Sequence, residues 1–331
     1  MNNNLKIWNN LYNVVTKWNE QQPWLRFESA DWFQITFPDH DQPYYCSILG
    51  DTNCVYGLSI YTGLDGLKDL ASLAACEFDQ ILDNYLICNQ TCITFYMRNR
   101  VNLFKEQKAI IEELNPSFSN DSKWPYFATL KKGYIPYHIS DDDALLFIKI
   151  MEELLEIDDL YQAGKIDIRF NEGELLCATL QDEKWHYEAM VTPDVDPFGV
   201  MEFSDKQLLE KLSQAPKNDA CLEIDLAYLN QEITEASYSK PLNHLVFLVF
   251  NSDTGASIHN QTIFPEDNNL SIVLDFVIGY ILQFGSPKRI IFRNPEIWAC
   301  LFELAERCNI DLTCQDLPLS NQYIEDNGDL F

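Results

Sequence analysis

The sequence predicts two domains of mixed α and β structure, and three observations support that prediction. The chain has 331 residues, which is enough for two domains of ordinary size. Segments with apolar residues at helical spacing alternate with short apolar runs that are typical of strands. The stretch "TPDVDPFG" at 192–199, with two prolines and a glycine, interrupts this series. We therefore expect one domain over residues 1–195 and a smaller α/β domain over 196–331.

The first half is expected to contain a helix, a three-strand meander and then alternating helices and strands. Leu5, Trp8, Leu11 and Val15 recur at three- and four-residue steps, which predicts a helix over 5–19. The expected strands of the meander cover 31–38, 43–50 and 54–61, with a turn at Gly50, Asp51 and Asn53. The elements expected next are a helix over 64–82, a strand over 85–97, a helix over 101–114, an extended segment over 124–137, a helix over 140–157 that begins at a Ser140 cap, and strands over 173–180 and 184–191.

The second half repeats the alternation with a hairpin at its centre. The residues Asp253, Thr254 and Gly255 predict the turn of a hairpin over 244–264. The other expected elements are a helix over 204–214, a strand over 220–229, a helix over 269–284, a strand over 288–294, a helix over 295–309 opened by Pro295, and a strand over 310–315. The tail "EDNGDLF" is expected to be loose.

The chain is strongly acidic, with 51 Asp and Glu residues against 23 Lys and Arg and a formal net charge of −28. This balance disfavours direct binding to DNA or RNA, because nucleic-acid binding needs a positive face. It is compatible with a surface that docks on a basic protein partner or mimics a nucleic acid. The least acidic part of the chain, where we would expect an anion site if there is one, includes Arg98, Arg100, Lys105, Lys108, Lys123, Lys131 and Lys132.

The composition predicts a cytoplasmic protein without a membrane span. The longest apolar runs, such as "HLVFLVF" at 244–250, are too short to cross a bilayer. The first residues, "MNNNLKIWNN", lack the basic-then-apolar layout of a signal peptide. Ten cysteines without such a signal indicate a reducing compartment and free thiols. The cysteine and histidine spacings match no zinc motif, so no metal site is expected.

Several motifs resemble a known family. The motifs "YYCSILG", "YGLSIYTGLDGL", "WPYF" and "GYIPY", together with the element order up to residue 192, resemble the acyl-CoA N-acyltransferase fold. They also resemble a bacterial family of two-domain proteins with an acyltransferase-like first domain. The segment "RIIFRNPEIWACLFELAERCNIDL" is similar to that family's second domain, which has no assigned function. The resemblance implies an N-terminal acyltransferase-like mixed sheet with flanking helices.

The resemblance also implies a cofactor site. In acyltransferases, the loop after the fourth strand holds the pyrophosphate of acyl-CoA through backbone N–H groups and a helix dipole. The matching residues are Tyr61, Thr62, Gly63 and Gly66, where two glycines permit close approach of the backbone. Asp65 departs from the family's pattern, because a carboxylate repels a pyrophosphate unless it caps the helix and points away. The segment is therefore either a site for acyl-CoA or a structural turn before a capped helix.

Acyl transfer would also require a base for the amine and an acid for the leaving thiolate. Tyr134, Tyr137 and His138 in "GYIPYHI" are the candidates for these catalytic roles. Tyrosine and histidine in such a segment equally fit packing and surface positions.

The element order of the second half resembles that of ribonuclease H-like integrases and transposases, whose acidic residues hold two metal ions. One carboxylate of those enzymes follows the strand after a G-x-P turn, which here is the place of Asn294. The hydrophobic first strand offers Asn251, and Asp253 lies in the following turn. A neutral amide is a poor replacement for a bridging carboxylate, so the resemblance implies a non-catalytic domain.

Three functions remain open from the sequence. The first is a non-catalytic binding or adaptor protein with an unknown protein partner, which the departures at Asp65, Asn251 and Asn294 favour. The second is an acyl-CoA-dependent N-acyltransferase, which predicts a splayed strand pair beside Tyr61. The third is an acidic nucleic-acid mimic, which depends on the net charge alone and predicts a salt-sensitive complex with a basic protein.

Overall fold

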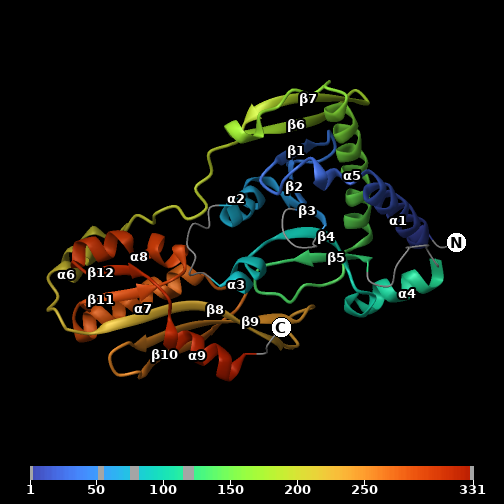
Figure 1. Ribbon diagram of the computed structural model, residues 1–331. Coiled ribbons are helices and arrows are strands. Elements are labelled where there is room, and N and C mark those ends of the chain that lie inside the picture. Colours follow the sequence, from blue (N-terminus) through green and yellow to red (C-terminus); the bar gives the residue numbers. More distant parts are fainter. Residues whose placement is uncertain (1–2, 51–55, 75–81, 115–122, 329–331) are drawn as a thin grey trace. The chain divides into compact units, whose positions relative to one another are not determined.

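The computed structural model describes residues 3–50, 56–74, 82–114 and 123–328 (Figure 1). The chain divides into two compact units, each of which has its own sheet. The first unit consists of Met1–Leu70, Thr91–Lys131 and Pro136–Val195. The second consists of Ala71–Gln90, Lys132–Ile135 and Asp196–Phe331. Both sheets are mixed, which confirms the predicted two-domain α+β fold class.

The first unit contains a seven-stranded sheet. Its strands are β1 (Trp32–Thr36), β2 (Tyr44–Leu49), β3 (Gly57–Thr62), β4 (Cys92–Arg98), β5 (Trp124–Leu130), β6 (Glu174–Gln181) and β7 (Lys184–Val191). The strand order is β5-β4-β3-β2-β1-β6-β7. Neighbouring strands are antiparallel except β1 and β6, which are parallel. The meander predicted from the sequence is therefore present, although residues 51–55 at its second turn lie outside the described residues.

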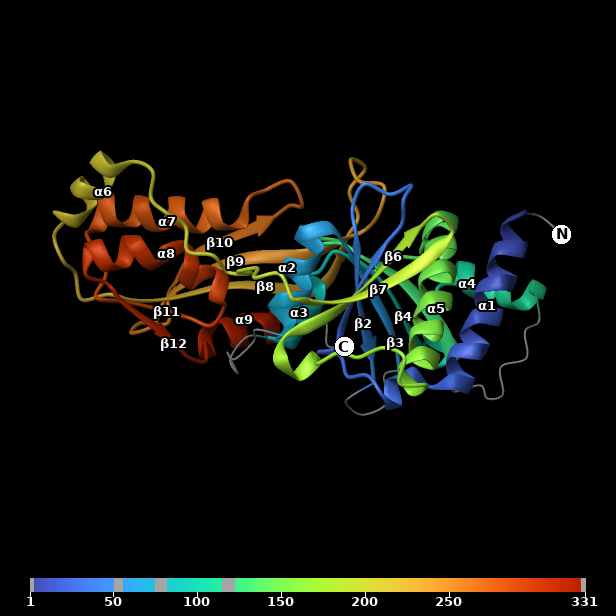
Figure 2. The ribbon, with the colours of Figure 1, turned by 90° about the horizontal axis from the view of Figure 1, so that it is seen from above.

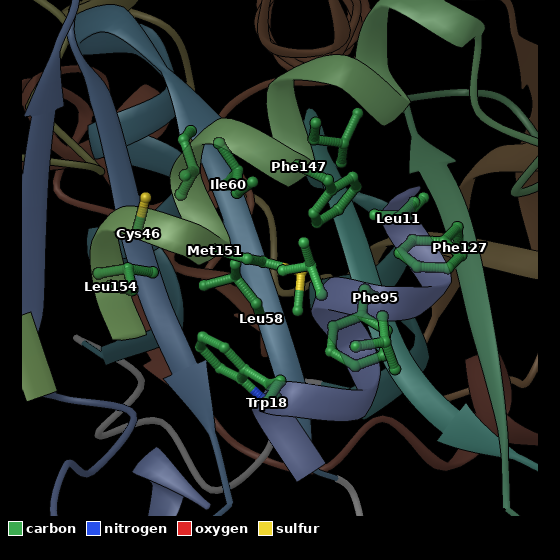
Figure 3. Packing of buried hydrophobic residues seen from close by; sticks show 14 of the residues in the cluster. Leu11, Trp18, Cys46, Leu58, Ile60, Phe95, Phe127, Phe147, Met151 and Leu154 are labelled. Atoms are coloured by element: carbon green, nitrogen blue, oxygen red, sulfur yellow. The ribbon is translucent and has the colours of Figure 1, made fainter. Parts of the chain in front are cut away.

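Helices cover both faces of this sheet. The helices and short 3-10 turns before the linker to the second unit are α1 (Asn3–Gln21), η1 (Pro23–Leu25), α2 (Gly63–Ala74), η2 (Arg100–Asn102), α4 (Lys105–Leu114), α5 (Asp141–Gln162) and η3 (Phe170–Glu172). Figure 1 shows α1, α4 and α5 on one face and α2 on the other. The main core lies under α1 and α5, where Trp18, Phe95, Phe147 and Met151 interdigitate (Figure 3).

The sequence signals at the helix ends explain where α5 begins. Ser140 is its N-cap and accepts a hydrogen bond from the Asp143 N–H at 3.1 Å. The Asp143 carboxylate accepts in turn from the Ser140 N–H at 2.9 Å, which completes a capping box. Three aspartates in the first turn also stabilise the helix, because their negative charges lie near the positive end of its dipole.

The second unit contains a five-stranded sheet. Its strands are β8 (Cys221–Ile233), β9 (Leu242–Asn251), β10 (Ser257–Ile263), β11 (Arg289–Phe292) and β12 (Asp311–Cys314). The strand order is β10-β9-β8-β11-β12. The strand β9 is antiparallel to both of its neighbours, whereas β11 runs parallel to β8 and to β12. The central strand of the second unit is therefore β8.

Helices also cover both faces of the second sheet. The helices are α3 (Asp83–Cys88), α6 (Lys206–Ser213), α7 (Asn269–Phe284), α8 (Pro295–Cys308) and α9 (Pro318–Asn327). The larger core lies between the sheet and α6, α7 and α8, and α9 packs on the opposite face (Figure 2). Within the described residues, no helix has the length and apolar character needed to cross a membrane.

The structure corrects two local predictions. The strand expected over 85–97 begins only at Cys92, because residues 83–88 form α3. Tyr85 of α3 is 2% exposed and belongs to the core of the second unit, so burial there outweighs the β propensity of the segment. The first residues of the tail expected to be loose are helical up to Asn327, and residues 329–331 lie outside the described residues. The segments 71–90 and 132–135, which the predicted boundary gives to the first domain, belong to the second unit.

Candidate functional site

The glycine-containing segment after β3 contains no open loop, because α2 begins at Gly63 directly after Thr62. Gly63 has a φ of +65°, and its N–H donates to the Pro43 carbonyl at 2.9 Å. A Cβ at Gly63 would lie 2.2 Å from Oε1 of Gln42. The glycine is therefore needed for a left-handed residue in contact with Gln42, and its N–H already has an acceptor.

The surroundings of Tyr61 are closed as well. Tyr61 is 2% exposed, and burial raises the pKa of its hydroxyl well above the ordinary value. A Cβ at Gly66 would lie 2.9 Å from the Cβ of Tyr61, so these two residues pack directly on each other. The strands β3 and β4 are paired antiparallel at 57–60 and 93–96, so they do not splay apart in this register. Acyl-CoA binding at Tyr61, Thr62, Gly63 and Gly66 stays a prediction to which the geometry adds no support.

Asp65 is not the cap of α2. The helix begins two residues earlier, at Gly63, so that Asp65 lies within its first turn. Its side chain is fully exposed, with Oδ1 4.0 Å from Nζ of Lys68. The carboxylate is therefore exposed to solvent, and it favours the helix through the dipole rather than as the predicted N-cap.

The three candidate catalytic residues occupy separate environments. Tyr134 belongs to the second unit, where its backbone pairs with Leu242. Tyr137 belongs to the first unit and exchanges two backbone hydrogen bonds with Thr129, at 2.8 and 3.2 Å.

His138 also lies in the first unit. Its ring stacks on Trp8, with centroids 5.0 Å apart. Its Nδ1 lies 3.3 Å from Nε2 of the buried Gln107. Backbone pairing and ring stacking thus account for the positions of Tyr134, Tyr137 and His138, whose catalytic roles stay a prediction.

The most unusual polar group of the second unit is a fully buried ion pair. Asp225 on β8 is 0% exposed, and Arg293, directly after β11, is 2% exposed. The Arg293 guanidinium donates to both oxygens of Asp225, to Oδ1 at 3.2 Å from Nε and to Oδ2 from Nη2. Burial raises the pKa of the Asp225 carboxyl, and the charge and hydrogen bonds of Arg293 oppose that rise.

The helix α9 completes this polar cluster. Nη1 of Arg293 donates to Oδ1 of Asn321 at 2.6 Å, and Nδ2 of Asn321 donates to Oδ1 of Asp316 at 2.9 Å. Glu223, two residues before Asp225 on the same face of β8, accepts from the Ser320 N–H at 2.7 Å. The carboxylates of β8 are therefore engaged by a cation and by the backbone of α9.

The residues singled out from the sequence have structural roles here. Asn294 is the N-cap of α8, and its Oδ1 accepts from the Glu296 N–H at 2.9 Å. Oδ1 of Asn251 accepts from the N–H groups of Asp253 and Thr254, both at 3.0 Å, in the hairpin turn. In the part of the chain that the structure describes, no three His, Cys, Asp or Glu side chains come together as a metal site.

Asp225 is not among the residues predicted from the sequence, because the resemblance to ribonuclease H-like enzymes was placed with β9, which ends at Asn251, as the first strand. The structure places β8 there, and β8 carries Glu223 and Asp225. The signal was present in "CLEIDLAYL", where two acidic residues occupy alternate positions of an otherwise apolar strand. In a strand, that spacing puts both carboxylates on one face.

The second unit also contains a pocket of about 270 Å³ beside the first turn of α7, with both apolar and polar residues in its lining. Asn89, Asp267 and Glu296 contribute to its lining. Oε2 of Glu296 accepts from the Tyr85 hydroxyl at 2.6 Å, and Oε1 accepts from Nδ2 of Asn89 at 3.2 Å. The buried Tyr228, also in the lining, accepts from the Gly133 N–H at 3.2 Å. Carboxylate and amide groups thus give this pocket the means to hold a small polar group.

Comparisons with known proteins give two family matches and no described function. The model of the domain of unknown function DUF7309 matches residues 8–178, and that of the domain of unknown function DUF6930 matches residues 208–326. No curated protein matches the sequence.

Among solved structures, a chain of the "CryoEM structure of simian T-cell lymphotropic virus intasome in complex with PP2A regulatory subunit B56 gamma" is similar at 13% identity. The similarity has a TM-score of 0.24 and covers 34% of this chain and 41% of that chain. This chain therefore spans less than half of the chain that it matches.

The family of the chain follows from the extent of the first match. Residues 8–178 make up more than half of the 331 residues, and the second match follows in the C-terminal part. The chain belongs to the family defined by DUF7309, and in it this domain is followed by a DUF6930 domain.

Proposed function

We propose that this protein is a non-catalytic binding or adaptor protein. The observation that carries the proposal is the buried ion pair between Asp225 and Arg293. The strand order β10-β9-β8-β11-β12, with β9 reversed, supports the resemblance of the second unit to ribonuclease H-like domains. In those enzymes, acidic residues hold two metal ions.

In this chain, the residues at the positions that correspond to those metal ligands do not fit a metal centre. A guanidinium contacts both oxygens of Asp225, so a cation fixed to the chain already neutralises the carboxylate. Asn294 stands where a second carboxylate would be expected, and its amide oxygen caps α8. A metal ion would have to displace Arg293 from a site that is closed to solvent.

The net charge supports a basic protein as the partner. A charge of −28 accelerates encounter with a positively charged surface and makes the complex sensitive to salt. The cysteines that the structure describes form no disulfide, which supports a reducing compartment such as the cytoplasm. A pull-down at low salt that recovers a basic protein, released by raising the salt concentration, is the expected result.

A nuclease and metal-binding assay tests the non-catalytic proposal. We expect the full chain to cleave neither single- nor double-stranded DNA with Mn²⁺ or Mg²⁺, and calorimetry with Mn²⁺ to show no binding in the second unit. Asp225→Asn is the informative variant, and Asp253→Asn, in the exposed turn of the hairpin, is its matched control. Metal-dependent cleavage that Asp225→Asn abolishes and Asp253→Asn leaves intact would overturn the proposal.

The alternative acyl-CoA-dependent transfer has its own test. A ligand that binds only the folded state stabilises it by about 2.7 kcal/mol at a hundred times its dissociation constant. Because the Gly63 N–H and the space beside it are occupied, we expect acetyl-CoA and free CoA to leave the melting temperature unchanged at millimolar concentration. A saturable rise would favour the acyltransferase instead.

A further inference from the structure

The first unit contains a pocket that the functions considered above do not use. Its volume is about 480 Å³, and its lining comes from the segment directly after β1, from one turn of α5, and from β6 and β7. The lining combines the aromatic rings of Phe37 and Trp185 with the carboxyl groups of Asp39, Glu152 and Glu153. It therefore joins apolar walls to an excess of negative charge.

The aromatic walls meet at a fixed angle. The ring centroids of Phe37 and Trp185 are 5.7 Å apart, with the planes at 70° to each other. Phe37 is 3% exposed as a whole residue, so the core holds its ring in place, whereas Trp185 is half-buried. In an edge-to-face pair the edge of one ring points at the other ring, and the negative face of an aromatic ring attracts cations.

One carboxyl group lies deep in the pocket and is held in position. Glu153 is 4% exposed, and its Oε1 accepts a hydrogen bond from the Tyr187 hydroxyl at 2.8 Å. Glu152 and Asp39 are exposed and add negative charge at the rim. A buried carboxyl in a cavity is expensive when ionised, so it gains from a cationic partner.

A lysine of the chain itself lies against the aromatic wall of this pocket. Nζ of Lys149 lies 5.3 Å from the centroid of the Phe37 ring. Within the part of the chain that the structure describes, Lys149 makes no ion pair, although Glu152 and Glu153 follow on the same helix. An alkylammonium group thus already lies against the aromatic wall, and the carboxyl groups of the pocket remain available for a second one.

We propose that this pocket binds a primary alkylammonium group, with its carbon stem against Trp185 and Leu180 and its charge on Glu153. The chemistry is common to a free aliphatic diamine and to a lysine side chain of a basic protein segment. The inference concerns the first unit and does not depend on the ion pair of the second unit. Such a pocket gives an acidic protein a means to select its cationic ligand.

Binding should depend on pH through Glu153. Burial raises the pKa of its carboxyl to about 7, although the Tyr187 hydroxyl opposes that rise. An ammonium ion favours the ionised carboxylate, so affinity should increase about tenfold from pH 6 to pH 8 and then level off. The charged and titratable groups that face Glu153 or line its pocket are Lys149, Glu152 and Glu156 on α5, Tyr187 on β7, and Asp39 after β1 with His40 beside it.

Calorimetric titration of the full chain tests the proposal. The probes are putrescine and Nα-acetyl-lysine methylamide, and 1,4-butanediol serves as the uncharged match. We expect both amines to bind and the diol not to bind. Binding of putrescine alone would identify a free diamine as the ligand, and binding of the lysine derivative would identify a lysine side chain. If neither amine binds at a concentration of about 10 mM, or if the diol binds as tightly as the amines, the proposal is refuted.

Variants separate a binding role from a structural one. Glu153→Gln keeps the shape and an acceptor for Tyr187 but removes the charge, so affinity should fall about tenfold or more and lose its pH dependence. Glu156→Gln, three residues along on the exposed side of α5, removes a charge outside the pocket lining and should change affinity little at pH 8, where Glu153 is ionised with or without Glu156. A pH dependence that survives Glu153→Gln would assign the titration to another group and refute the site.

Lys149→Met gives a prediction of opposite sign. Removing the internal ammonium frees the Phe37 ring, so the amines should bind about threefold more tightly. A structural role for Lys149 would not predict any gain, and weaker binding would contradict the proposal. Thermal unfolding of each variant shows whether the fold is retained.

Discussion

Replacing Arg293 by methionine should destabilise the protein strongly. The substitution leaves the Asp225 carboxylate, which is 0% exposed, without its counter-ion and leaves Asn321 without its donor. Breaking a buried pair by removing one partner typically costs about 3–5 kcal/mol in the free energy of unfolding. For a unit of this size, that corresponds to a melting temperature lower by about 6–20 °C.

Equilibrium unfolding in urea at pH 7 measures the effect. The comparison includes the double variant Asp225→Leu with Arg293→Met, which replaces the pair by apolar side chains. Such a replacement is often neutral or even stabilising, so the double variant should recover most of the stability that Arg293→Met loses. The difference between the two variants isolates the cost of an unpaired buried charge.

The pH dependence gives a second check. In Arg293→Met, burial raises the pKa of Asp225 without opposition from the guanidinium, so that protonation relieves the penalty. Because the folded-state pKa would then lie above the unfolded one, the loss of stability should shrink as the pH falls through the folded-state value. A loss below about 1 kcal/mol at pH 7, or a double variant as unstable as Arg293→Met, would refute the reasoning.

Three further predictions concern the first unit. The folded-state pKa of Glu153, about 7, lies above its unfolded value, so the folded state loses stability as the pH rises from the unfolded value to the folded one. The variant Glu153→Gln should therefore be more stable than the parent by about 1–3 kcal/mol at pH 8 and equal to it at pH 4, and urea unfolding at both pH values measures the difference. Ser140→Ala removes the cap of α5 and should cost about 1 kcal/mol, whereas an unchanged urea midpoint would contradict the role of the capping box with Asp143. Gly63→Ala forces a side chain into a left-handed conformation against Gln42 and should cost about 1–2 kcal/mol in thermal unfolding; a neutral result would show that the φ of +65° is not required.

Local signals in the sequence, such as helix caps and turn residues, predicted the elements whose ends they mark. The start of α5 follows from Ser140 and the acidic turn behind it, and the hairpin over 244–264 follows from its Asp-Thr-Gly turn. Such signals act over a few residues, so the sequence displays them directly. The prediction for the segment of α3 was wrong for the opposite reason. This segment is a helix because Tyr85 is buried in the core of the second unit, and the β propensity of the neighbouring residues does not indicate that burial.

The candidate sites depended on long-range partners and were harder to predict. The glycines after β3 have the spacing of a phosphate loop, but Gln42 and Pro43, twenty residues earlier, fill the place of a ligand. The sequence predicts the strand over 220–229, but acidic residues in a strand usually indicate exposure, and only the distant Arg293 explains why Asp225 is buried. The pocket around Glu153 joins four segments that have no motif in common.

The chain passes between its two units at residues 70–71, 90–91, 131–132, 135–136 and 195–196, and this has a consequence for how the two family domains can be inherited. A gene fragment that encodes residues 196–331 alone would lack Tyr85, which lies in the core of the second unit, and Gly133, which donates to Tyr228. Recombination at the proline-containing linker would thus separate the second unit from residues of its own core. Shuffling at this linker should therefore yield second units that fail to fold.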